Sequence, residues 1–136
     1  MQYSYCIKKI MFKQLITKDA PAAIGPYSQG VIVGNVLYAS GQIPADPATG
    51  EVKGDITAQA EQALKNVGGL LKANGMDYAN VVKTTCFLAN MGDFAKFNEV
   101  YAKYFSADPK PARSCVAVKD IPKGCLCEVE VLAIKE

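Results

Sequence analysis

The chain has 136 residues and a net charge of +2; half of its residues are hydrophobic and about a fifth are charged. That length suits one domain with its own core, and the composition is typical of a soluble globular protein. Since the lysines are scattered and no apolar stretch approaches the ~20 residues that span a bilayer, we expect a cytoplasmic protein that binds neither nucleic acid nor membrane. Residues 1–10 carry no secretory pattern and are expected to be a loose extension before a single domain at 11–136.

Two counts narrow the chemistry. The sequence contains no histidine, which excludes Ser-His-Asp and Cys-His catalysis and the usual histidine sites for zinc or iron. An odd number of cysteines without a CxxC pair argues against a disulfide framework or a four-cysteine zinc site. We therefore expect no metal, and we expect reduced cysteines with a mainly structural role at Cys6, Cys86, Cys115, Cys125 and Cys127.

The first third of the chain predicts three strands. The first is expected at 11–17, before a loop that contains proline. The next two, at 30–33 and 36–40, flank Gly34-Asn35, a pair that suits the tight turn of a β-hairpin. A long loop rich in Pro, Gly and Asp follows. We therefore expect a hairpin with one further strand ahead of it.

Apolar residues at helical spacing predict two helices. Asp55 is a suitable N-cap for the first helix, and Asn74-Gly75 ends it. Asp93 is expected to cap the second helix, which ends before Pro109. The apolar stripes are Ile56, Ala60, Ala63, Leu64, Val67, Leu70 and Leu71 in the first helix, and Phe94, Phe97, Val100, Tyr101, Tyr104 and Phe105 in the second.

Three more strands complete the order β, β, β, α, β, α, β, β. They are expected at 81–88, 113–118 and 125–134, the last two joined by a turn at 120–124. Two amphipathic helices must bury their stripes on one face of the sheet, which predicts an α+β two-layer sandwich. The other sheet face is then open although its strands are apolar, so we expect self-association.

Arg113 is the only arginine in the chain, and all other basic residues are lysines. Its planar guanidinium can bind a carboxylate or phosphate through two parallel hydrogen bonds, which lysine cannot reproduce. It stands where a loop with two prolines leads into an apolar strand. The pattern indicates an anion-binding residue, with a structural ion pair as the alternative.

Three other polar residues do not fit a pure packing account. Asn98 falls on the apolar stripe of the second helix, where a buried amide needs a partner; bonding to nearby backbone is the alternative. Glu128 and Glu130 project from one face of the last strand. If a partner subunit covers that face, at least one carboxylate is partly buried and its pKa is raised, as acid–base catalysis requires. The alternative is a solvated edge-strand face.

Loop residues complete a candidate site. Tyr27 lies in a loop and Ser40-Gly41 ends a strand, although ordinary turn chemistry accounts for these residues equally well. Because Gly41 has no side chain, its backbone N–H can approach a ligand closely. Together with an arginine fork and a carboxylate, these residues suggest a site for a small carboxylate substrate and an activated water. The site has no metal ligands and no strong nucleophile apart from a possible Cys115.

Six segments occur in the order of one known family. They are APAAIGPYSQG at 20–30, SGQIP at 40–44, GEV at 50–52, VKTT at 82–85, Asp93-Phe94 with Asn98, and PARSCV at 111–116. On these motifs the chain resembles the RidA family, also called the YjgF family, over essentially all of 11–135.

The resemblance implies a chorismate-mutase-like fold, a mixed sheet with two helices on one face, assembled as a homotrimer with sites between subunits. It implies a 2-iminobutanoate/2-iminopropanoate deaminase, which hydrolyses reactive enamine and imine acids such as 2-aminoacrylate to 2-keto acids and ammonia, without cofactor or metal. By the same resemblance, Arg113 would bind the substrate carboxylate and Glu128 would activate water. The other site residues would shape the pocket: Tyr27, Ser40, Gly41, Asn98 and Cys115. Cys115 would contact the substrate or water through its backbone rather than its thiol.

The chain departs from the family pattern at 1–10, in a 105–111 connection that is shorter by a residue or two, and at Cys125 and Cys127. None of these removes a motif residue, so they bear on specificity more than on activity. One alternative function is a non-catalytic regulator that binds a small 2-keto or amino acid. Another is an endoribonuclease or translation inhibitor, against which the near-neutral charge and the missing histidine argue. A chaperone-like role has no signal in the sequence.

Overall fold

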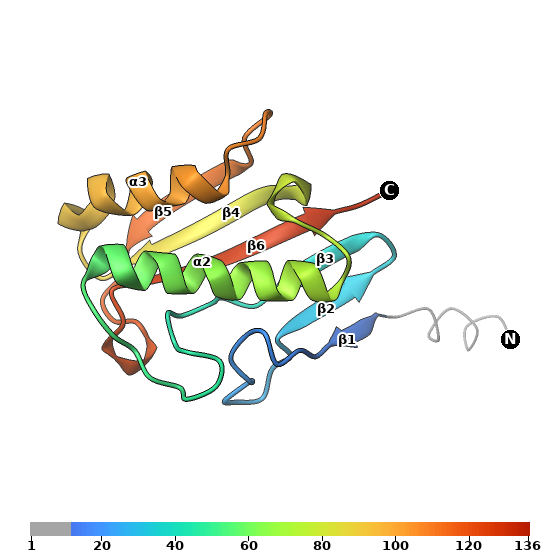
Figure 1. Ribbon diagram of the computed structural model, residues 1–136, viewed down its shortest axis with the longest axis horizontal. Helices are drawn as coiled ribbons and strands as arrows, with labels where there is room; N and C mark the ends of the chain where they lie inside the picture. The colour runs from blue at the N-terminus through green and yellow to red at the C-terminus, as the bar shows by residue number, and fades with distance from the viewer. Residues whose placement is uncertain (1–11) are drawn as a thin grey trace, which may run out of the picture.

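Two helices lie across one face of a six-stranded sheet in the computed structural model, which describes residues 12–136 (Figure 1). The predicted α+β two-layer architecture is therefore confirmed, with both helices on the same face. The extension expected at 1–10 and the thiol of Cys6 lie outside the described residues. None of the helices within 12–136 is long and apolar enough to cross a membrane.

The elements follow the predicted order, with three short 3-10 helices added between them. They are β1 (Lys13–Leu15), β2 (Gly30–Val33), β3 (Val36–Ala39), α2 (Ile56–Ala73), η1 (Tyr78–Asn80), β4 (Val81–Leu88), η2 (Met91–Asp93), α3 (Phe94–Tyr104), β5 (Ala112–Ala117), η3 (Pro122–Gly124) and β6 (Cys127–Ile134).

The strands are hydrogen-bonded in the order β1-β2-β3-β6-β4-β5. All neighbours are antiparallel except β4 and β5, which are parallel because α3 crosses over between them. Thr84 of β4 is the register partner of Arg113 in β5, and Phe87 of β4 is the partner of Glu128 in β6. These two pairs decide which face of the sheet each candidate residue occupies.

The first helix forms as its sequence predicts. The Asp55 side chain accepts a hydrogen bond from the N–H of Ala58 at 3.0 Å, and Asn74 is the C-cap residue. Gly75 follows with a φ of 67°, the left-handed conformation that glycine tolerates best. The whole stripe of α2 is buried against the sheet, with Leu64, Leu70 and others fully inaccessible.

The start of the second helix differs from the prediction. Asp93 makes no side-chain capping bond. Instead, the Asn90 side chain accepts from the N–H of Gly92 at 2.8 Å, and the turn of η2 leads straight into α3. Asp93 therefore stands at the predicted N-cap position of α3, but the side-chain capping bond is made one short helix earlier, because Asp93 already belongs to a helical turn. The far end of α3 is Tyr104, with Phe105 as the C-cap residue.

The first strand is shorter than predicted for a specific reason. Thr17 was expected to continue it, but the Gln29 amide takes both of its backbone groups: Oε1 accepts from the N–H at 2.9 Å, and Nε2 donates to the carbonyl at 3.0 Å. A side chain thus replaces the neighbouring strand, and the chain leaves the sheet after Leu15. The last strand begins at Cys127 rather than at 125, because the N–H groups of Cys125 and Leu126 donate to the Pro122 carbonyl and to Oε1 of Gln59 instead of to a neighbouring strand.

The face of the sheet opposite the helices is uncovered in the single chain, as the sequence predicts. It exposes apolar side chains, among them Tyr38 at 49% and Val116 at 46%. Four cysteines lie in the described residues and all are free: Cys86, Cys125 and Cys127 are buried and Cys115 is half-buried. Their packing role agrees with the expectation from the sequence.

Candidate active site

The predicted site residues fall into two groups on opposite faces of the sheet. Arg113 is the partner of Thr84, which is fully buried and hydrogen-bonded to α3, so Arg113 faces the helices. Glu128 stands between Cys127 and Val129, both fully buried in the helix-covered core, so its side chain projects to the open face. One chain therefore does not bring Arg113 and Glu128 together.

Arg113 is held by one stripe of α3. Its Nη1 donates to the side-chain oxygen of Asn98 at 2.7 Å. Its guanidinium carbon lies over the ring of Tyr101, 4.6 Å from the centroid, and over the ring of Phe94 at 5.4 Å. Residues 94, 98 and 101 lie on the same side of the helix, since they are separated by about one turn each. The partner of Asn98 is thus Arg113 and not nearby backbone.

A structural ion pair does not account for Arg113. The ion pairs within residues 12–136 join three lysines to carboxylates and do not include this guanidinium. Guanidinium carries five N–H donors, and the bond to Asn98 is the one side-chain hydrogen bond that Arg113 makes in the described part of the chain. A half-buried cation with donors to spare is suited to bind an anion from outside this chain.

Cys115 lies two residues after Arg113 on the same face of β5. Burial raises the pKa of its thiol, and the nearby guanidinium only partly offsets the rise. The thiol is therefore protonated near neutral pH, and a protonated thiol is a poor nucleophile. This supports the expectation that the thiol is not the reactive group. A contact through the Cys115 backbone stays a prediction.

The second group lines a cleft on the open side of the chain. The cleft has a volume of ≈ 380 Å³. Its walls are Ile24, Tyr27, Ser40, Gly41, Ile43, Pro122, Glu128 and Glu130. Four of the predicted residues, Tyr27, Ser40, Gly41 and Glu128, are therefore brought together.

Gly41 lies directly against the Glu128 carboxylate. A Cβ placed on Gly41 would stand 2.2 Å from Oε1 of Glu128 and 2.9 Å from its carboxyl carbon. No side chain fits there unless the carboxylate moves. The sequence predicted that Gly41 allows a close backbone approach, and the close neighbour in this chain is Glu128. Glycine at this position leaves room for the carboxylate.

The environment of Glu128 suits acid–base chemistry. Burial raises the pKa of its carboxyl above the ordinary value, and the negative charge of Glu130 raises it further. Both carboxylates lie on the same side of β6, as the alternation in the sequence predicts. A carboxyl group with a raised pKa accepts and returns protons closer to neutral pH than an ordinary one.

The two hydroxyl groups in the cleft have different hydrogen-bonding capacity. Tyr27 accepts from the backbone N–H of Ile24 at 3.2 Å, which leaves its own O–H available as a donor. Ser40 donates to the Ser28 carbonyl at 2.6 Å, so its proton is already used. Of the two, Tyr27 is the better donor to a bound ligand.

Buried amide side chains hold the loops around the cleft. Gln29 donates to the carbonyls of Ala20 and Pro21 at 3.2 and 2.8 Å, which ties down the loop that carries Tyr27. Asn66 of α2 donates to Ile43 and Ala45 at 2.9 and 2.8 Å, which ties down the segment after Gly41.

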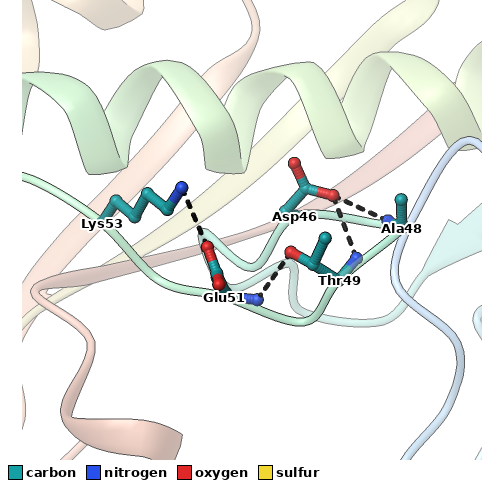
Figure 2. Close-up of polar contacts among 5 residues, drawn as sticks. All are labelled: Asp46, Ala48, Thr49, Glu51 and Lys53. Carbon is teal, nitrogen blue, oxygen red and sulfur yellow. Dashed lines mark hydrogen bonds and ion pairs between the residues drawn. The ribbon is translucent and has the colours of Figure 1, made fainter.

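The segment that follows is ordered by its own polar contacts (Figure 2). Asp46 Oδ1 accepts from the N–H groups of Ala48 and Thr49 at 2.8 and 3.2 Å, and Lys53 pairs with Glu51 at 2.8 Å. The loop between β3 and α2 is thus ordered by internal hydrogen bonds, and Asn66 attaches one end of it to the helix.

No group of three possible metal ligands lies close together within residues 12–136.

Sequence reasoning missed several residues that position the site. Phe94 and Tyr101 were interpreted as core residues of α3, although they also contact Arg113. The available signal was their spacing around Asn98, which places all three on one side of the helix. Gln29 and Asn66 gave no comparable signal, because their partners lie far away in the sequence or in irregular loops.

Comparisons with known proteins identify the family. Residues 17–135 match the family model described as Endoribonuclease L-PSP. A relative from Lactococcus lactis that is named as a regulator, AldR, is 53% identical over 122 residues, which are 89% of this chain and 96% of the relative. The 2-iminobutanoate/2-iminopropanoate deaminase of Escherichia coli K12 is 46% identical over 127 residues, 92% of this chain and 99% of that protein.

The fold agrees with this match. The crystal structure of RidA from the Antarctic bacterium Psychrobacter sp. PAMC 21119 has a TM-score of 0.87 and 41% identity to this chain, with 90% of this chain and 99% of that one covered. The chain therefore belongs to the Endoribonuclease L-PSP family, and more particularly to the RidA proteins, also called YjgF, whose motifs and fold it shares. Its relatives are named as deaminases and also as a regulator.

Proposed function

We propose that the chain hydrolyses 2-imino and 2-enamino acids to 2-keto acids and ammonia, without a cofactor. The observation that carries the proposal is the guanidinium of Arg113, which is half-buried between β5 and α3. It has no carboxylate partner among residues 12–136 and has donors left for a substrate carboxylate. The named deaminase that matches almost the whole chain supports the same reaction. The proposed substrates are 2-iminopropanoate and 2-iminobutanoate, formed from 2-aminoacrylate and its methyl homologue.

In the proposed reaction Arg113 binds the substrate carboxylate through two N–H groups and thereby fixes the imine carbon. Glu128 takes a proton from a water molecule as its oxygen attacks that carbon. The C=N bond becomes a C–N single bond, and Glu128 returns the proton to nitrogen. Glu128 then moves the proton of the newly formed hydroxyl to the nitrogen, and ammonia leaves as the C=O bond of the 2-keto acid forms. Tyr27 donates a hydrogen bond to the substrate or the water.

We propose further that the two groups of site residues meet between copies of the chain in a homotrimer. A closed ring joins two different patches of the same chain at each interface. The Arg113 group and the Glu128 group lie on opposite faces of the sheet, which suits such an arrangement. The exposed apolar residues of the open face, Tyr38 and Val116, support its burial in an assembly.

The first test generates 2-iminopropanoate in solution and follows its loss with the wild type, Arg113→Ala and Arg113→Lys. We expect the wild type to exceed the buffer rate and both variants to lose about 100-fold in kcat/KM, since lysine lacks the planar fork. A wild type that matches the buffer rate would contradict the proposal.

The assembly is tested by mixing inactive variants. Arg113→Ala and Glu128→Ala chains, unfolded and refolded together, would form mixed rings in which about one quarter of the interfaces combine an intact Arg113 with an intact Glu128. Activity should return to roughly that fraction of the wild type. If the mixture stays as inactive as each variant alone, the site is not shared between chains in this way.

A second candidate function is a regulator that binds a small 2-keto or amino acid without converting it. The relative named as a regulator, 53% identical to this chain, favours it. It predicts a wild type that does not accelerate imine hydrolysis but binds pyruvate in a calorimeter, with binding lost in Arg113→Ala. The description of the family as an endoribonuclease suggests RNA cleavage as another alternative. If the chain cleaves RNA, a single-stranded RNA probe should be degraded, and Glu128→Ala should slow that degradation.

A further inference from the structure

Arg113 of β5 is connected to α3 and β4 by a series of side-chain contacts. Its guanidinium carbon lies nearer to the ring of Tyr101, at 4.6 Å, than to that of Phe94, at 5.4 Å. The Tyr101 hydroxyl is hydrogen-bonded to the side chain of Thr84, with 2.8 Å between the oxygens. Thr84 is in turn the register partner of Arg113. The ring is therefore fixed at both ends relative to the strand that carries the arginine.

The ring of Tyr101 also packs against two other aromatic rings of α3 and its C-cap. It packs against Phe105 with 4.5 Å between centroids, and against Phe97 with 6.0 Å. Phe97 and Phe105 are both buried in the core. Tyr101 is thus a rigid surface on which a flexible side chain rests. An arginine loses considerable rotamer freedom when it binds a ligand, and a ring that restrains it beforehand lowers that cost.

We propose that Tyr101 is a positioning residue: its ring holds the Arg113 guanidinium in the orientation that receives a substrate carboxylate, and it does so without touching the substrate. This inference rests on the proposed role of Arg113 as the carboxylate-binding residue. Asn98 fixes one edge of the guanidinium, through Nη1, and Tyr101 supports its face. The remaining N–H groups are then presented in a fixed direction.

The ring and the hydroxyl of Tyr101 can be removed separately. Tyr101→Phe keeps the ring and removes the bond to Thr84, whereas Tyr101→Leu removes the ring. Tyr104→Leu is the matched control: it removes another half-buried tyrosine of α3, one that packs against Tyr78 at a tilt and donates to Glu61 rather than contacting Arg113. The control reproduces the loss of packing without affecting the guanidinium.

Steady-state kinetics with 2-iminopropanoate give the first readout. We expect Tyr101→Leu to raise KM about tenfold, because the carboxylate is gripped in the bound substrate as well as in the transition state. Tyr101→Phe should stay within about threefold of the wild type. A variant that only loses packing would contain less active enzyme, so its apparent kcat would fall while KM remained unchanged. We expect this result for Tyr104→Leu.

The second readout needs no catalysis. As the only arginine in the chain, Arg113 gives a single side-chain Nε–H signal in a nitrogen-15 NMR spectrum. The neighbouring rings shift this signal, so Tyr101→Leu should move it, and Tyr104→Leu and Tyr101→Phe should not. Titration with pyruvate should move the wild-type signal, and Tyr101→Leu should need about tenfold more pyruvate for the same change.

The outcomes separate the two proposals. A wild type that binds pyruvate through Arg113 but does not hydrolyse the imine overturns the deaminase function and leaves the role of Tyr101 supported by the signal. If Tyr101→Leu changes neither the signal nor the pyruvate titration, the positioning role is wrong, whatever the catalytic result. Equal changes in Tyr101→Leu and Tyr104→Leu would also overturn it, since they would reflect a general loss of packing.

Discussion

The Arg113 group and the Glu128 group are built by different means. Arg113 rests on side chains that one regular helix presents at successive turns. Glu128 lies where loops cross the end of β6, and its carboxylate occupies space that a side chain at Gly41 would fill. A helix orients its side chains by its own geometry, whereas loops must be tethered from elsewhere. We therefore expect the Glu128 group to be more sensitive to small changes at a distance.

The largest effect is expected from cutting a loop tether. Asn66→Leu leaves the carbonyls of Ile43 and Ala45 without their donor, and should lower the free energy of unfolding by about 3 kcal/mol in a urea titration. The signal of Arg113 should not move. Lys65→Leu, the same replacement at the exposed neighbour, should change stability by less than about 0.5 kcal/mol. A loss for Asn66→Leu as small as that would contradict the tether.

A displaced carboxylate should come next. Gly41→Ala puts a Cβ against Glu128, so we expect kcat/KM to fall about 100-fold through misplacement of the base. The control is a double-mutant cycle with Glu128→Asp, whose shorter side chain makes room. Adding Gly41→Ala to Glu128→Asp should cost far less than adding it to the wild type. Equal costs in both backgrounds would show that contact with Glu128 is not the cause.

A smaller effect is expected on the helix side. Thr84→Val removes the hydrogen-bond partner of the Tyr101 hydroxyl and should cost about 1 kcal/mol of stability. Burial already raises the pKa of Tyr101, and the bond to Thr84 opposes that rise, so the pKa should increase further in an ultraviolet titration. Thr85→Val, at the next residue on the opposite face, should leave that pKa unchanged. A fall in the Tyr101 pKa would contradict the contact.

The smallest effect concerns pH. Burial and then Glu130 raise the pKa of Glu128, so Glu130→Gln should lower it and move the acid limb of kcat/KM to lower pH. Folding shows the same linkage: the folded state holds this proton more tightly than the unfolded chain, so stability falls as pH rises from the ordinary value through the raised pKa. That decline should shrink in the variant. Glu51 pairs with Lys53 and does not line the cleft, so Glu51→Gln should leave the acid limb of the kcat/KM profile unchanged. A shift of that limb to higher pH in Glu130→Gln would contradict the interpretation.

Patterns with a short period made much of this fold predictable. The stripes of α2 and α3 repeat at helical spacing, and the alternation around Glu128 and Glu130 defines a strand with two different faces. Arg113 stood out because no other arginine competes with it. Each of these signals is contained within a few turns of helix or a few residues of strand, where local geometry alone determines which side chains share a face.

The features that escaped prediction depend on partners remote in sequence or on irregular backbone. Gln29 and Asn66 hold segments that no periodicity connects to them. Asp93 had the right residue type for a cap, but the turn that begins at Asn90 had already started the helix. The division of the site between two faces followed only from strand register, which pairs Arg113 with Thr84 and Glu128 with Phe87.

The contact between Gly41 and Glu128 also constrains how this chain can change by mutation. Any single-base change in a glycine codon that replaces the residue introduces a side chain, and the first atom of every such side chain would fall 2.2 Å from Oε1 of Glu128. The carboxylate must therefore turn away, shorten or disappear when position 41 changes. A descendant of this chain that no longer has Gly41 is expected to hold the carboxylate of residue 128 in a different place, or to lack it.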